Sequence, residues 1–150
     1  IVAASGARLY IAAEAGHLYR SDDAGATWIE LPSPYEGSLF GVLPLNGDAL
    51  LAYGLRGHLF HSNDAGLTWR EIQTHTEAML NDAVRLPGGG IVIVGLSGSI
   101  LTGTDSGESY GLRQRPDRKG LSGIIAVGPA DLITVGEGGI HAITIKAAGT

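Results

Sequence analysis

Short apolar runs alternate with turn-forming residues along the whole chain. Runs of five residues begin at Leu9, Leu50 and Ile91, and each is followed by a turn that contains glycine. Near-continuous apolar runs of this length are typical of strands that are buried on both faces. No segment has the apolar spacing of an amphipathic helix. The pattern therefore predicts an all-β protein built from short strands and tight turns.

The runs recur in a fixed order, four to a unit. The first runs are IVAA, GVLPL, AVRL and IIAV, and the second are LYIAA, LLAYG, IVIVG and LITVG. The third are HLYRS, HLFHS, SILTG and IHAIT, and the fourth are TWIEL, TWREI and SYGLR. A glycine that can take positive φ, as a tight hairpin requires, is expected at the end of the turn before each third run. These glycines are Gly16, Gly57, Gly98 and Gly139.

An eight-residue motif sets the length of the unit. SDDAGATW at 21–28 returns as SNDAGLTW at 62–69 and, altered, as GTDSGESY at 103–110. The motif aspartates are evenly spaced, since 64 − 23 and 105 − 64 both equal 41. Four strands in about 41 residues are typical of one blade of a β-propeller. We predict a single array of four-stranded antiparallel blades, with three to four blades present, at about 1–31, 38–73, 79–113 and 121–146.

The array is expected to be incomplete at both ends. The first unit begins inside its innermost strand, and the last ends after its third strand. A blade cannot bury both of its faces alone, so an open arc would expose two apolar flanks. Three arrangements would cover them: a larger ring of which this chain is part, a remainder of the chain, or self-association with a second copy.

Composition narrows the chemistry. One domain is expected from 150 residues, and 24 glycines suit many tight turns. The net charge of −5 argues against a nucleic-acid surface that depends on bulk positive charge. The absence of cysteine excludes disulfides, thiolate metal sites and a cysteine nucleophile. No apolar run reaches the roughly 18 residues of a membrane span. We predict no cofactor and no metal site.

The repeated motif has the residue types of a structural corner between the third and fourth strands. We expect the aspartate to accept N–H groups two and three residues further on, and the glycine to take the left-handed conformation. The hydroxyl adds a hydrogen bond, and the aromatic ring should pack against the next blade. The alternative is calcium or ligand contact. The motif residues are Ser21, Asp23, Gly25, Thr27 and Trp28, then Ser62, Asp64, Gly66, Thr68 and Trp69, then Asp105, Gly107, Ser109 and Tyr110.

The pattern S-x-D-x-G-x-T-W resembles the Asp-box, or BNR repeat, of sialidase-like propellers. Over its whole length the chain most resembles the photosystem II stability/assembly factor family, through segments such as LLAYGLRGHLF, IVIVGLSGSI and ITVGEGGIH. The resemblance implies a non-enzymatic scaffold that binds a protein client and is exported, periplasmic or extracellular. The family's arginine patch would fall on Arg113, Arg115, Arg118 and Lys119.

The alternative is a propeller that binds or hydrolyses glycosides. A glycosidase requires two carboxylates placed across the scissile bond. Acidic residues are present, but none has a spacing that singles it out. A sialidase would also need an arginine cluster introduced by an R-I-P type motif, which the chain lacks.

Binding residues are expected on the face opposite the Asp motifs, where the other turns and the linkers between units lie. The candidates are Arg56 and His58 in a turn and Tyr35, His75 and Glu77 in linkers, together with the four basic residues named above. Others on that face are Glu14, His17, Glu36, Asn81, Asp82, Asp117 and Glu137. His17 and His58 share one repeat position, so equivalent strand-start residues are the structural alternative. The basic segment is either an exposed linker or a grip for an acidic peptide or phosphate.

Overall fold

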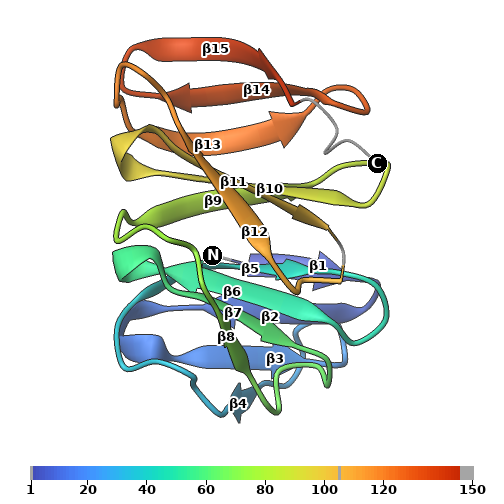
Figure 1. The fold of residues 1–150 in the computed structure, drawn as a ribbon. Helices are drawn as coiled ribbons and strands as arrows, with labels where there is room; N and C mark the ends of the chain where they lie inside the picture. Colours follow the sequence, from blue (N-terminus) through green and yellow to red (C-terminus); the bar gives the residue numbers. More distant parts are fainter. Residues whose placement is uncertain (1, 105, 146–150) are drawn as a thin grey trace.

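The computed structural model describes residues 2–104 and 106–145 and consists of four antiparallel sheets in chain order (Figure 1). The first sheet contains β1 (Val2–Ser5), β2 (Arg8–Ala12), β3 (Leu18–Ser21) and β4 (Ile29–Leu31). The second contains β5 (Leu39–Pro44), β6 (Leu50–Gly54), β7 (Leu59–Ser62) and β8 (Arg70–Ile72). The third contains β9 (Leu80–Arg85), β10 (Gly90–Gly95), β11 (Ser99–Thr104) and β12 (Tyr110–Gln114). The fourth contains β13 (Leu121–Ala126), β14 (Asp131–Gly136) and β15 (Gly139–Thr144).

Each sheet packs face to face on the next, and the first strands of consecutive sheets contact one another. Three apolar clusters fill the three boundaries. In the middle cluster Leu51 and Tyr53 of β6 meet Ile91 and Ile93 of β10. The arrangement is that of consecutive β-propeller blades, and the described sheets do not close a ring (Figure 1). The predicted fold class is confirmed.

Alternate residues of a strand serve different boundaries, because successive side chains point to opposite faces. We call the face toward the following sheet the forward face and the other the rear face. Tyr10, Leu51 and Val92 lie on forward faces, one in each boundary cluster. Their neighbours Leu50 and Ile91 lie on rear faces. Side chains 41 residues apart therefore lie on the same face of successive sheets. Because both faces of these strands are buried, odd and even positions are both apolar, which produces the near-continuous runs of the sequence.

The turns between second and third strands follow the prediction in three sheets. Single 3-10 turns, η1 (Glu14–Gly16), η2 (Leu55–Gly57) and η3 (Leu96–Gly98), each end in a glycine with positive φ. They lie along the left edge of Figure 1. In the fourth sheet Gly139 also has the predicted positive φ, but its place differs: Gly136 pairs with Gly139, which leaves a two-residue turn and makes Gly139 the first residue of β15. One residue fewer in this turn offsets β15 from the 41-residue step.

Three residues expected in linkers lie in strands instead. Asn81 and Asp82 belong to β9, and Arg113 belongs to β12. Asn81 donates from Nδ2 to the Leu121 carbonyl at 2.7 Å, and Asp82 Oδ2 accepts the Ile124 N–H at 2.9 Å. Both side chains therefore fasten the third sheet to the fourth.

Candidate functional site

The repeated motif forms a corner that satisfies its own polar groups. Ser21 Oγ accepts the N–H groups of Asp23 (3.3 Å) and Gly25 (2.8 Å) and donates to Asp23 Oδ1. Asp23 in turn accepts the N–H of Thr27 at 2.8 Å and its hydroxyl at 2.7 Å. The expectation that aspartate accepts N–H groups two and three residues on is wrong, because the serine takes the near donors and the aspartate the one four residues on.

The second corner repeats this geometry. Ser62 and Asp64 make the same five hydrogen bonds, at 2.6 to 3.3 Å. In each corner the hydrogen bonds from threonine lower the pKa of the aspartate, of Asp23 and Asp64 alike, to about 2. Both carboxylates are ionised at neutral pH and engaged within their own turn, so neither presents a free ligand.

The aromatic residue of the corner packs toward the preceding sheet, not the next one as predicted. Trp69 donates its indole N–H to the Pro32 carbonyl at 3.1 Å and packs on the boundary between the first two sheets. Tyr110 lies in the boundary between the second and third sheets. Trp28 has no preceding sheet within the part of the chain that the structure describes. Its indole donates to Gly25 of its own corner at 3.1 Å, and its side chain is 38% exposed.

The third corner is only partly described, because Asp105 lies outside the described residues. The hydroxyls of Thr104 and Ser106 are 2.8 Å apart, and Gly107 takes the left-handed conformation like Gly25 and Gly66. Ser109 is exposed.

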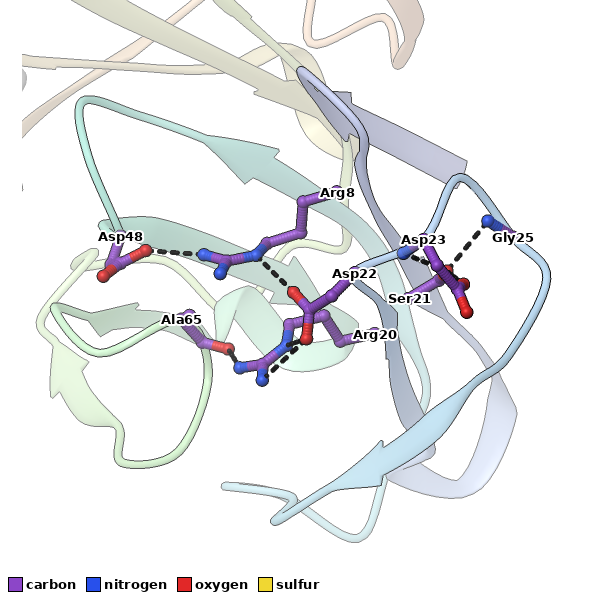
Figure 2. A network of polar contacts seen from close by, with 8 residues as sticks. All are labelled: Arg8, Arg20, Ser21, Asp22, Asp23, Gly25, Asp48 and Ala65. Atoms are coloured by element: carbon purple, nitrogen blue, oxygen red, sulfur yellow. Dashed lines mark hydrogen bonds and ion pairs between the residues drawn. The ribbon is translucent and has the colours of Figure 1, made fainter.

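Arginines join the first two corners in a network that the sequence reasoning missed (Figure 2). Arg8 bonds Asp22 at 2.6 Å and Asp48 of the second sheet at 2.5 Å. Arg20 bonds Asp22 at 3.1 Å and the Ala65 carbonyl at 3.0 Å. The hydrogen bond from Arg8 lowers the pKa of Asp22. The two arginines balance the charges of the two aspartates, so the network links the first sheet to the second and leaves no unpaired charge to bind an ion.

His61 occupies, in the second sheet, the repeat position that Arg20 has in the first, since 61 − 20 equals 41. The ring is 3% exposed and packs against Gly107 of the third sheet. Its Nε2 has no hydrogen-bond partner. Burial, assisted by the charge of Arg70, lowers the pKa of this imidazole. His61 is therefore a neutral, buried side chain that packs between the second and third sheets.

At the end of the sheets opposite the corners, the turn between the second and third strands contacts the linker that follows the fourth strand of the same sheet. A side chain at Gly57 would overlap the carbonyl oxygen of Thr76, and one at Gly16 would overlap that of Tyr35. Thr74 Oγ1 donates to the Gly57 carbonyl at 2.7 Å. In the second sheet, the binding residues predicted in the turn (Arg56 and His58) and in the linker (His75 and Glu77) therefore line one open depression of about 410 Å³. This second-sheet depression is lined by Arg56, His58, Glu71, Gln73, Thr74, His75 and Glu77, among others.

Aromatic and acidic groups surround His58 at the edge of this depression. The ring centroids of Tyr35 and His58 are 4.2 Å apart, and those of His58 and Phe60 are 5.8 Å apart. His58 Nδ1 is 2.7 Å from Glu71 Oε1, and His17 and Glu30 form the same pair at 2.6 Å. Sequence reasoning named the histidines and missed the glutamates. The signal was present, because both glutamates follow their histidine by 13 residues, once in each unit.

The basic segment before the fourth sheet does not form one uniform patch. Arg115 bonds Asp117 through two nitrogens, at 3.1 and 2.9 Å, which lowers the pKa of that carboxyl. Arg118 is exposed with a left-handed backbone, and Lys119 is exposed beside the turn at Gly138. Glu137, in that turn, accepts the N–H of Gly120 at 3.2 Å.

The remaining predicted residues of this face surround a neighbouring hollow. Tyr35 and Glu36 line an open depression of about 440 Å³ together with Ala15, Ser33 and Pro34. Glu14 begins η1 and directly precedes Ala15, which lines this depression. Among residues 2–104 and 106–145, no three histidine, aspartate or glutamate side chains are grouped as a metal ion would need. The same residues contain no helix that is long and apolar enough to span a membrane.

Comparisons with known proteins show likeness in fold alone. Neither protein-family models nor curated proteins give a match to the sequence. Among solved structures, YCF48 bound to D1 peptide superposes with a TM-score of 0.70 at 18% identity, over 94% of this chain and 47% of that one. YCF48 from Cyanidioschyzon merolae gives 0.70 at 16%, over 97% and 53%. An ancestral GH74 enzyme gives 0.80 at 14%, over 95% and 22%. The WD40 β-propeller domain of Doa1 gives 0.76 at 12%, over 99% and 50%.

Two facts follow. The fold is that of a β-propeller segment, and the chain spans about half the length of the YCF48 chains that it matches. Identities of 12 to 18% leave the chemistry of the loop face to be argued from its own residues.

Proposed function

We propose that this protein is a non-enzymatic scaffold that binds an extended segment of a protein client on its loop face. The observation that carries the proposal is the second-sheet depression, where side chains from a turn and a linker converge. The YCF48 structure with a bound D1 peptide is support from a protein of the same fold. Membership of the corners in the Asp-box class is part of the proposal and is supported by the two full motif copies. An exported location is also part of it and rests on the family resemblance alone.

The chemistry of the depression suits a peptide. Arg56 and His75 offer donors, whereas Glu71 and Glu77 offer acceptors, so a client with both charges and exposed backbone groups would find partners. The adjacent rings of Tyr35 and His58, tilted by 38° to each other, offer an aromatic surface for an apolar or aromatic side chain of the client. The depression is open, which suits a segment lying across the face.

Peptide display against the immobilised chain tests the proposal. Peptides are expected to be enriched, and the double variant Arg56→Ala, Glu77→Gln should weaken their binding at least tenfold. Alanine fits at residue 56, because Ala15 takes the same left-handed conformation in the first sheet. Asn63→Ala, an exposed change on the opposite face, is the matched control and should bind normally. Failure to enrich peptides, or equal binding by the double variant, would refute this site.

The second candidate is glycoside binding, which the GH74 structure favours through the shared fold. Tyr35 beside His58 and Glu71 is the kind of aromatic and acidic combination that sugars contact. A glycan array with the same variants separates the two. Glycan binding without peptide binding, lost on Tyr35→Ala, would replace the first proposal by the second.

A further inference from the structure

The forward face of the fourth sheet is largely apolar, and no other described sheet covers it. Its exposed side chains are Ile125 and Val127 (59% each), Val135 (42%) and Ile140 (74%). They share one face, because Ile125 pairs with Ile133 and Val135 pairs with Ile140 across neighbouring strands. A contiguous apolar surface of this kind marks an interface.

The same positions are buried in the sheets before it. In the third sheet the counterparts of Val135 and Ile140 are Val94 and Ile100, which are 0% and 2% exposed against the fourth sheet. In the second sheet the counterpart of Val135 is Tyr53, at 3%. Apart from Asp131 and Thr144, which bond each other at one end of it, the face therefore has the composition of an internal boundary, and among the described residues no further sheet covers it.

A rear face of that type is open at the other end of the described chain. Leu9 and Ile11 are half-buried on the first sheet, whereas their counterparts Leu50 and Ala52 are 1% and 0% exposed. Trp28 is 38% exposed and bonds its own corner, whereas Trp69 bonds the preceding sheet. The molecule thus carries both halves of the boundary that it builds three times internally.

We infer that the forward face of the fourth sheet binds the rear face of the first sheet of a second copy of this chain. The two copies would make this contact twice, head to tail around a common axis. The two open faces support the pairing, because each lacks what the other supplies: exposed Ile125, Val135 and Ile140 on one, and half-buried Leu9 and Ile11 with exposed Trp28 on the other. Contact between like faces is disfavoured, because each of the three internal boundaries sets a forward face on a rear face.

The mass of the 150-residue chain in solution is the first test. Light scattering or sedimentation from about 1 to 100 µM should give twice 15.5 kDa, about 31 kDa. Ile140→Lys, or Ile125→Glu with Val127→Glu, should shift the midpoint of dissociation at least tenfold upward. Leu67→Glu is the control, because Leu67 is 52% exposed in a corner of the second sheet, away from both faces. Far-UV circular dichroism checks that every variant is folded.

Changes on the first sheet distinguish this pairing from one between like faces. Trp28→Glu with Ile11→Lys should also dissociate the pair, although it leaves the fourth sheet intact. A mixture of this variant with a fourth-sheet variant should recover association in part, because one of the two contacts is then unaltered. A monomer at every concentration overturns the proposal, because the two open faces would then not bind each other between copies. So does a first-sheet variant that stays dimeric, or a Leu67→Glu control that dissociates.

Discussion

The indole N–H of Trp69 donates to the carbonyl of Pro32, and this one hydrogen bond ties the second sheet to the segment that leaves the first. The two residues are 37 positions apart in the sequence and have β5, β6 and β7 between them, so the bond closes a long stretch of chain. It also explains why the corner aromatic points backward: the carbonyl that it reaches lies in the preceding linker.

Trp69→Phe should lower the free energy of unfolding more than Trp28→Phe. The first change removes a bond between sheets, worth about 1 kcal/mol, while the second removes a bond within one exposed corner. Urea denaturation of the two variants at equal concentration measures the difference. Equal losses would mean that the inter-sheet bond adds no stability.

Asp82→Ala should loosen the fourth sheet. The change leaves the N–H of Ile124, a residue that is 6% exposed, without its acceptor, at a cost of about 2 kcal/mol. Asp82→Asn retains one oxygen and should cost less. Hydrogen exchange should accelerate in β13 to β15 and remain unchanged in β1 to β4, and uniform acceleration would contradict a local fastening.

Acid should destabilise the corners between about pH 4 and pH 2. The folded-state pKa of Asp23 and Asp64, about 2, lies below the ordinary 3.8, so the unfolded chain binds protons first as the pH falls. The stability that these carboxylates add is complete above pH 4 and is lost as pH approaches 2. Asp64→Asn should flatten this part of the profile of urea midpoint against pH. An unchanged slope in the variant would place the acid sensitivity elsewhere, for example at Asp22.

His61 should make the fold sensitive to mild acid. Burial lowers its pKa below the ordinary 6.5, and Arg70 adds to this effect while Glu108 opposes it. The unfolded chain therefore takes up a proton before the folded one, and stability declines as pH falls below about 6.5. His61→Leu should flatten the decline. If wild type shows no change in urea midpoint between pH 8 and pH 5, His61 does not act this way.

Gly57→Ala should be far more damaging than Gly47→Ala. Both glycines have positive φ, so both substitutions strain the backbone by about 1 kcal/mol. Only at Gly57 would the new methyl group also overlap the linker at Thr76, since nothing lies within 4 Å of a side chain at Gly47. Thermal unfolding should separate the two variants clearly, and similar melting temperatures would show that the linker yields easily.

The fold was predictable because its signal is periodic. The apolar runs, the glycine turns and the eight-residue motif that recurs every 41 residues all predict the same four-stranded unit, and three copies of the motif establish the length of that unit. The exception was the turn at Glu137 and Gly138, where the glycine that kept the 41-residue step belongs to a strand, because Gly136 pairs directly with Gly139.

The site was predictable only in outline. The alternation of strands placed turns and linkers on one face, but which side chains remain free depends on partners that the sequence does not reveal. Arg115 is held by Asp117, and Asn81 and Asp82 bond the fourth sheet. Glu30 and Glu71 lacked a motif, although their shared spacing from a histidine was there to be found.

The corners close upon themselves, and this has a consequence for the rest of the molecule. Because Ser21, Asp23 and Thr27 satisfy one another, as Ser62, Asp64 and Thr68 do, that end of the first two sheets needs no polar group from a binding partner. The loop face carries part of the framework as well, because the linker holds Gly57 there, but exposed side chains such as Arg56 and Glu77 can differ without a change in the corners. New specificities would therefore be sought at those exposed loop positions.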